Sequence, residues 1–371
     1  AMVDMDSMPA GHWVRGILPA CRPLGSLMEM TGLLALALRE GASDLHLAAG
    51  RVPNIRVDGR MRRLDLPPLE PSAMKALLDE ILSDSQRREF DQCHDLDFAL
   101  ELPGAPRCRV NVFEQLHGSA AVLRLLPARV PSLEELGLGE VLRRLLEVES
   151  GLVLITGPTG SGKSTTLAAL VDHLNRQRPW HILTLEDPVE FIHPPQSSQI
   201  SQREIHRHTL GFAPALRAAL RQDPDVIMLG ELRDLDSIRL ALTAAETGHL
   251  VLATLHTSSG VKSLDRVGDG FAPEEKSLVR GLLAESLQAV VSQVLVPRTG
   301  GGRVAAHEIL MATPAVRTLI REGKTAQLYS SMQTGAGQGM QTLDSCLQGL
   351  LRRGVISGAS VRASGGSPLP F

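Results

Sequence analysis

The chain of 371 residues has a net charge of −3 and 43% hydrophobic residues, which is typical of a globular protein with two domains. Its aromatic content of 3% argues against base-stacking surfaces, so we expect no nucleic-acid partner, and no run of roughly 18 apolar residues indicates a transmembrane helix. The four cysteines form no C-x-x-C pair, which predicts neither a zinc site nor a disulfide framework and favours a reducing, cytoplasmic setting.

The N-terminal part of the chain predicts an appendage followed by an α/β domain. Residues 1–28 have no sustained hydrophobic period, so we expect a segment that is disordered or was partly added in cloning. The pattern over residues 29–126 predicts the domain. We expect a hairpin turn at Asp58-Gly59 and a helix with Ser72 as its cap, running toward Leu82. The other predicted elements are a helix over 33–38 and strands over 44–47, 54–57, 107–113 and 118–126.

The prolines Pro127 and Pro131 indicate a linker over 127–140. The spacing of hydrophobic residues changes after it. Over 141–312, helices alternate with buried strands, which we predict at 152–155, 182–185, 226–229 and 250–255. This order predicts an α/β fold with a mostly parallel sheet and helices on both faces. Residues 313–357 predict helices, and the Ser/Gly/Pro-rich residues 358–371 predict a disordered tail.

A phosphate-binding loop connects the first of these strands to a helix. The segment reads G-P-T-G-S-G-K-S-T and fits the pattern G-x-x-x-x-G-K-[ST]. A chance glycine turn is the alternative, but the order of strand, loop and helix favours nucleotide binding. We expect ATP and Mg²⁺ as ligands, with Lys163 on the β- and γ-phosphates and the Ser164 hydroxyl on the metal. The predicted nucleotide-binding residues are Gly157, Pro158, Thr159, Gly160, Ser161, Gly162, Lys163, Ser164, Thr165 and Thr166.

Acidic residues follow the next two strands. Glu186, Asp187 and Glu190 come after the second strand and could hold Mg²⁺ through water or orient the attacking water, although a solvated acidic turn is the alternative. Glu231 follows the third strand and is the candidate for polarising water. Between that strand and Glu231, Gly230 would let the backbone approach the nucleotide. Ligands of parallel sheets lie beyond the carboxyl ends of the strands, so these residues should converge.

Histidine and arginine residues complete the predicted site. His256 ends the fourth strand, where an imidazole could sense or relay the state of the γ-phosphate; the role of His249, at the other end, stays open. Arg109 and Arg124 are candidate arginine fingers from the first domain, with ordinary surface arginines as the alternative.

Together these residues resemble the secretion-ATPase superfamily, in its type IV pilus retraction (PilT-like) branch, from about Met30 to Ile356. The motifs that carry the resemblance are the segment 41–47, the phosphate loop, the acidic box ending at Glu190, Glu231 and the histidine box 249–256. The segment 315–322 looks like the helix motif specific to retraction motors. Its motif residues are Ala315, Val316, Arg317, Leu319, Ile320, Arg321 and Glu322. The chain departs from the family pattern at Gly268-Asp269-Gly270.

The resemblance implies a homohexamer of a PAS-like N-terminal domain and a RecA-like ATPase domain. It implies catalytic roles for Lys163, Glu190, Glu231 and His256, and phosphate contacts between domains or subunits for Arg109 and Arg124. It further implies a cytoplasmic motor at the inner-membrane face that docks on a pilus platform protein, alone or with a second retraction ATPase. The alternatives are an assembly or type II secretion motor, an auxiliary subunit or scaffold with low turnover, and a nucleic-acid translocase.

Overall fold

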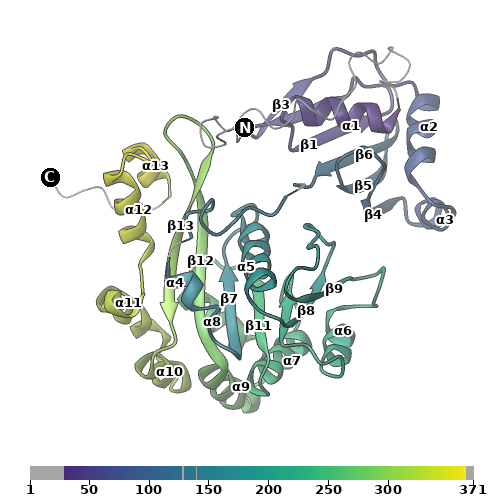
Figure 1. The fold of residues 1–371 in the computed structure, drawn as a ribbon. Coiled ribbons are helices and arrows are strands. Elements are labelled where there is room, and N and C mark those ends of the chain that lie inside the picture. The colour runs from purple at the N-terminus through teal and green to yellow at the C-terminus, as the bar shows by residue number, and fades with distance from the viewer. Residues whose placement is uncertain (1–28, 128, 139, 365–371) are drawn as a thin grey trace, which may run out of the picture. The chain divides into compact units, whose positions relative to one another are not determined.

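The computed structural model describes residues 29–127, 129–138 and 140–364, and the chain divides into two compact units, residues 1–128 and 129–371 (Figure 1). The predicted appendage, 1–28, lies outside the described residues. Within them, no helix is long and apolar enough to cross a membrane.

The first unit is built on a six-stranded antiparallel sheet with the order β3-β2-β1-β6-β5-β4. Alternating apolar residues of its strands, such as Val110 and Val112 on β5, pack with the helices into one core. The predicted PAS-like α/β domain is thereby confirmed. Its elements are α1 (Met30–Arg39), β1 (Asp44–Ala48), β2 (Asn54–Val57), β3 (Arg60–Arg63), α2 (Pro71–Ile81), α3 (Asp84–Cys93), β4 (Asp95–Leu100), β5 (Cys108–Gln115) and β6 (Gly118–Leu125).

Two local expectations in this unit differ from the structure. Ser72 does not cap α2, because the helix already begins at Pro71 with Glu70 as its N-cap residue. A proline fits the first helical position, where its missing N–H is not needed. The helix α3 was not predicted, although Ser83 and Gln86 form a capping box at its start. The spacing S-x-x-Q is a readable signal for that helix.

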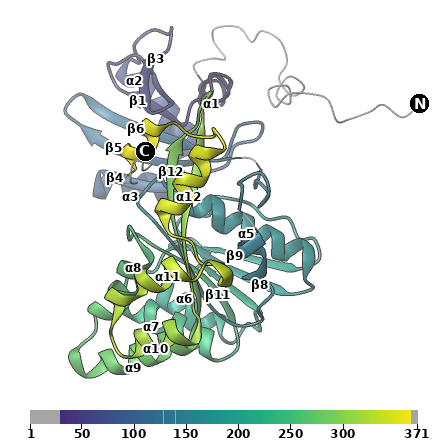
Figure 2. The same cartoon turned by 90° about the vertical axis from the view of Figure 1, so that its left-hand side faces the viewer.

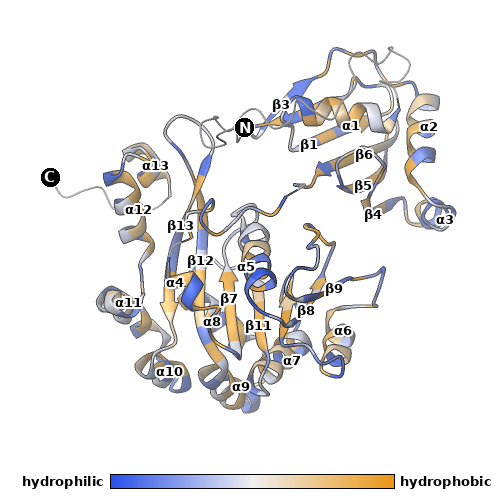
Figure 3. Ribbon diagram, in the orientation of Figure 1, coloured by the Kyte–Doolittle hydropathy of each residue, from blue (hydrophilic) through white to orange (hydrophobic). Residues whose placement is uncertain are grey.

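The second unit contains a seven-stranded sheet with the order β13-β12-β7-β11-β10-β8-β9, in which every neighbouring pair is parallel except β12 with β13. This arrangement confirms the predicted mostly parallel sheet. Figure 3 shows β7 and β11 as hydrophobic along most of their length, as expected of strands covered on both faces. The strands are β7 (Gly151–Thr156), β8 (His181–Glu186), β9 (Gln199–Glu204), β10 (Val226–Leu229), β11 (Leu250–Leu255), β12 (Leu287–Pro297) and β13 (Arg303–Met311).

Helices cover both faces of this sheet. One core packs α5 and α4 against the sheet, and the other packs α6, α7, α8 and α9 against its opposite face. The C-terminal segment follows, with α10 beside α9 (Figure 2). Its helix α12 packs against β13. The helices are α4 (Glu140–Arg144), α5 (Lys163–Gln177), α6 (Phe212–Ala219), α7 (Leu235–Glu246), α8 (Gly260–Asp269), α9 (Pro273–Ser286), α10 (Pro314–Arg321), α11 (Leu328–Thr334), α12 (Leu343–Arg352) and α13 (Gly358–Ala363), with short 3₁₀ turns η2 (Thr325–Gln327) and η3 (Ala336–Gln338).

Two predicted boundaries change. Much of the predicted linker, 127–140, packs into the second unit, because Val130, Leu133 and Leu138 are buried in the core beside α5. The predicted disordered tail begins too early. Residues 358–363 form α13, which Ser357 caps and whose Val361 packs into a small core with β12 and α12.

Candidate active site

The phosphate loop joins the end of β7 to the start of α5 and depends on glycine at two points. Gly157 has a φ of 148°, and a Cβ added there would lie 2.3 Å from the main-chain oxygen of Gln293. Gly162 precedes α5 with a left-handed φ of 87°, and a Cβ there would lie 2.9 Å from the Gln293 amide nitrogen. Side chains other than hydrogen would therefore force the loop out of this shape.

Lys163 is held at the loop by main-chain oxygens. Its Nζ donates to the oxygen of Gly157 at 2.9 Å and to that of Pro158 at 3.0 Å. Burial lowers the pKa of the Lys163 ammonium, and the negative charges of Glu231 and Glu190 oppose that shift. Both carboxylates are thus close enough to act on this ammonium through their fields.

The histidine after β11 connects the loop to the carboxylate after β10. His256 Nδ1 lies 3.4 Å from both Lys163 Nζ and Thr159 Oγ1, and its Nε2 lies 3.3 Å from Glu231 Oε1. The other oxygen of Glu231 accepts a hydrogen bond of 2.7 Å from Arg233 Nε. The structure thus brings the predicted residues Lys163, Glu231 and His256 together. It adds Arg233, which sequence reasoning missed although it closely follows Glu231 in the chain.

The three carboxylates at the end of β8 differ in their contacts. Glu186 is buried and accepts hydrogen bonds from Thr184 Oγ1 at 2.7 Å and from Gln202 Nε2 at 3.2 Å. Asp187 instead lies 3.5 Å from Arg233, and the charge of Glu190 acts on Lys163. In the described part of the chain, no three His, Cys, Asp or Glu side chains gather as a metal site. The predicted contacts of Glu186, Asp187 and Glu190 with Mg²⁺ through water stay a prediction.

The buried environment of Glu186 predicts a pH-dependent stability. Burial raises the pKa of this carboxyl from 4.5 to about 7. The folded protein therefore binds more protons here than the unfolded chain between these two values. The stability that this group contributes is full below pH 4.5 and is lost as the pH rises through 7.

Glu186→Gln should remove this dependence, since the amide stays neutral. As the pH rises from acidic to mildly alkaline, the free energy of unfolding of the variant should increase by about 1–3 kcal/mol relative to that of wild type. Urea unfolding at several pH values measures this gain. Glu149→Gln, at an exposed position, is the control, and a parallel pH profile for Glu186→Gln and wild type would contradict the assignment.

Thr166 and Gly230 contact other parts of the protein, and their predicted roles toward the nucleotide stay predictions. The Thr166 side chain is buried and donates from Oγ1 to Gln293 Oε1 at 2.7 Å, so its hydroxyl links the first turn of α5 to β12. Ser164, at the start of α5, is exposed and suited to a metal ligand. Gly230 approaches the end of β8, because a Cβ there would lie 3.4 Å from Glu186 Cα. It therefore allows β10 and β8 to end close together.

The candidate arginine fingers lie in the first unit, directly opposite each other on β5 and β6. Arg109 pairs with Asp97, and Arg124 Nε donates to the buried Asp44 at 3.0 Å. Their phosphate contacts stay a prediction. His249 lies just before β11, with its Nδ1 3.0 Å from the Ala244 oxygen, and is therefore away from the end that carries His256.

The segment with the predicted retraction motif forms α10, which Thr313 caps. Val316 and Ile320 are buried, while Arg317 Nη1 donates to the main-chain oxygens of Ala284 at 2.5 Å and Glu285 at 2.6 Å. These oxygens belong to the last turn of α9, so the guanidinium satisfies groups that a helix end leaves open. Arg321 pairs with the Glu285 side chain at 2.5 Å.

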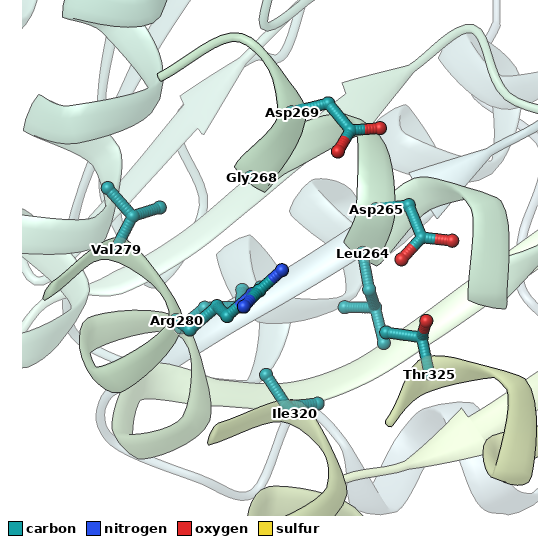
Figure 4. Close-up of a pocket in the computed structure, with 9 residues that line it drawn as sticks. Leu264, Asp265, Gly268, Asp269, Val279, Arg280, Ile320 and Thr325 are labelled. Carbon is teal, nitrogen blue, oxygen red and sulfur yellow. The ribbon is translucent and has the colours of Figure 1, made fainter. Parts of the chain in front are cut away.

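The residues that depart from the family pattern lie beside this helix. Gly268 and Asp269 of α8 line a pocket together with Arg280 of α9 and Ile320 of α10. Figure 4 shows Arg280 extending into that pocket. Gly323, just after α10, has a φ of 70°, and a Cβ there would lie 2.8 Å from Arg280 Nη1. Gly268 and Asp269 therefore belong to the surroundings of α10.

The parallel sheet with a glycine-rich loop, a lysine held at that loop and carboxylates at neighbouring strand ends defines a RecA-like P-loop ATPase. Residues 23–353 match the family described as type II/IV secretion system protein, and the chain belongs to that family.

Individual relatives agree with this assignment. The chain is 57% identical to the Pseudomonas aeruginosa type IV pilus retraction ATPase PilT over 93% of this chain and all of that relative. It is 52% identical to a twitching motility protein of Neisseria gonorrhoeae, over 84% of this chain and 83% of the relative. A crystal structure of the pilus retraction motor PilT with bound ADP superimposes with a TM-score of 0.85 at 42% identity, covering 92% of this chain and 98% of the other.

Proposed function

We propose that this ATPase is a motor that drives retraction of type IV pili. The observation that carries the proposal is the convergence of Lys163, His256 and Glu231 at the ends of three adjacent strands, in a chain similar over its length to pilus retraction ATPases. The segment α10 supports the retraction branch, because the motif residues from Ala315 to Arg321 lie on one helix with a defined docking on α9.

The chemistry would be in-line attack of water on the γ-phosphate. Lys163 would leave its contacts with the loop oxygens and neutralise charge on the phosphates, as positioned cations do in phosphoryl transfer. Glu231 would accept a hydrogen bond from the attacking water, with Arg233 fixing its orientation and His256 linking it to Lys163. Glu190 lies within electrostatic reach of the same ammonium.

Mg²⁺ fits the residues at the start of α5, where the exposed Ser164 hydroxyl would hold it beside the phosphates. When bound, the ion would neutralise charge on the β- and γ-oxygens. Asp187 and Glu190 would contact it through water at most, since in the described part of the chain they do not gather into a cluster of their own.

The mechanical output would come from a homohexamer. Arg109 and Arg124 would exchange their present carboxylate partners for nucleotide phosphates when subunits or domains close, which couples hydrolysis to rotation of one unit on the other. The motor would work at the cytoplasmic face of the inner membrane on a platform protein, alone or with a second retraction ATPase.

Deletion of the gene and a count of surface pili test the proposal. Loss of a retraction motor should leave hyperpiliated cells that do not twitch, whereas loss of an assembly motor should leave bald cells. Complementation with wild type should restore twitching and complementation with Lys163→Ala should not. Bald cells, or an unchanged pilus count, would refute the retraction role.

The docking of α10 predicts a separation of function. Arg317→Ala leaves two main-chain oxygens of α9 without this donor, so the variant should lose about 1–2 kcal/mol of unfolding free energy. Turnover should persist while twitching is lost, because α10 serves output in this proposal. The matched control is Arg239→Ala, which removes an exposed ion pair with Glu275, outside α10, worth at most about 1 kcal/mol. Normal twitching by a destabilised Arg317→Ala protein would contradict the role of α10.

A further inference from the structure

A buried polar pair lies behind the phosphate loop. Gln293 on β12 and His307 on β13 stand directly opposite each other in the antiparallel pairing and are only 2% and 6% exposed. Buried polar groups are costly unless they are hydrogen-bonded, so the partners of this pair, on the edge strand β13 and its neighbour β12, need to be identified.

The amide of Gln293 connects the loop, the helix and the histidine. Its Nε2 donates to the main-chain oxygen of Ser161 at 2.6 Å, while its Oε1 accepts from Thr166 Oγ1 at 2.7 Å. His307 Nε2 lies 3.1 Å from the same Oε1. Since an amide oxygen only accepts, the imidazole must carry its proton on Nε2.

The charge state of His307 agrees with this arrangement. Burial lowers the pKa of His307 to about 4, so the ring is neutral at physiological pH and holds one N–H. That N–H is directed at Gln293, which fixes the amide with its oxygen toward the histidine and its nitrogen toward the loop.

Gln293 also limits the loop by its volume. Its main-chain oxygen is the atom that a Cβ on Gly157 would meet at 2.3 Å, and its Nε2 is the atom that a Cβ on Gly162 would meet at 2.9 Å. The two ends of the loop and the first turn of α5 therefore all pack against Gln293, through its side chain or its main chain.

The histidine is in turn held from the C-terminal segment. Gln341 Nε2 donates to the main-chain oxygen of His307 at 2.9 Å, and the His307 main-chain N–H donates to Cys346 Sγ at 3.4 Å. Gln341 also forms a β-bridge with Ile309, further along β13. The main chain of His307 is thus held by residues that follow the ATPase core in the chain.

We propose that Gln293 and His307 are positioning residues that hold the phosphate loop in the shape that receives the nucleotide phosphates, without touching the nucleotide themselves. The proposal rests on the nucleotide binding assigned to this loop. A loop that already has its binding shape loses little conformational entropy when the nucleotide binds. Removing its support should therefore lower nucleotide affinity more than it lowers the rate of the chemical step.

The test uses the full-length protein and titration with Mg-ADP, with ATP turnover measured in parallel. Gln293→Met keeps the volume and removes both the amide oxygen and the amide nitrogen, and His307→Leu removes the donor. Each should weaken ADP binding by about tenfold and raise the KM for ATP similarly, with a much smaller change in kcat. Because both act through one contact, the double variant should be less affected than the product of the single effects predicts.

Conservative variants separate positioning from simple stability. His307→Gln can place a donor near the Nε2 position and should keep an affinity near wild type, whereas His307→Asn cannot reach and should resemble His307→Leu. Asn175→Leu removes a buried amide in the last turn of α5, at the end of that helix away from the loop. It should lower stability without changing ADP affinity.

Wild-type affinity in folded Gln293→Met and His307→Leu proteins would overturn the proposal. If those variants fail to fold, equal affinities of His307→Gln and His307→Asn would overturn it instead. The function of the loop itself is tested separately, by the affinity of the wild-type protein: a wild type that binds no nucleotide would refute it. The proposal about Gln293 and His307 is tested instead by the ratio of variant affinity to wild-type affinity.

Discussion

Lys163→Ala should lower steady-state ATP turnover by about a hundredfold or more, because the variant lacks the one loop side chain that carries positive charge to the phosphates. In the structure its Nζ is already at the loop, with hydrogen bonds of 2.9 and 3.0 Å to the oxygens of Gly157 and Pro158. Phosphate release with Mg-ATP in excess measures the effect. Because these contacts lie within the loop rather than in either core, the assembly state of the variant should match that of wild type.

The control for this variant is Lys262→Ala. Lys262 is exposed on α8, and its Nζ lies 3.5 Å from the Ser258 hydroxyl. Removing this lysine changes the net charge by the same amount without touching the loop. A Lys163→Ala protein with wild-type turnover would show that the site is elsewhere.

Glu231→Gln should separate nucleotide binding from hydrolysis. The substitution keeps the volume and the acceptor for Arg233 but removes the charge that would orient and polarise the attacking water. We expect hydrolysis to fall by about a hundredfold to ten-thousandfold, while ADP and ATP affinities stay equal or increase. Single-turnover hydrolysis and equilibrium titration measure the two effects.

Glu246→Gln, at the exposed end of α7, is the matched control for the loss of one carboxylate. If Glu231→Gln instead lost nucleotide affinity and kept its rate once saturated, Glu231 would be a binding residue. Glu190 would then become the leading candidate for orienting water, because it is the other carboxylate whose charge acts on Lys163.

The strands of the parallel sheet could be predicted well because each is a short apolar run that ends in a polar segment. The weaker predictions have physical causes. The strand β9 carries half-exposed polar residues at the sheet edge, so it lacks an apolar run. The helix α13 forms in a Ser/Gly-rich segment because its Val361 finds a core with β12, a tertiary contact that composition does not reveal.

Among the site residues, those at strand ends could be predicted because parallel strands bring their carboxyl ends to one edge. Lys163, Glu231 and His256 therefore lie together as expected. The acidic residues after β8 could not be sorted in advance. The chain leaves the strand there, which buries Glu186 in the sheet and leaves Asp187 beside Arg233.

Sequence alone determined the class of this protein, since the phosphate loop requires glycines, a lysine and a hydroxyl in fixed order and the flanking strand and helix are readable from hydrophobic spacing. Only the tertiary structure decided how that loop is held. Gln293 follows Ser161 by 132 residues and belongs to no local pattern with it. It meets the loop because β12 pairs with β7 in the sheet, and such long-range pairing is set by the packing of the whole unit.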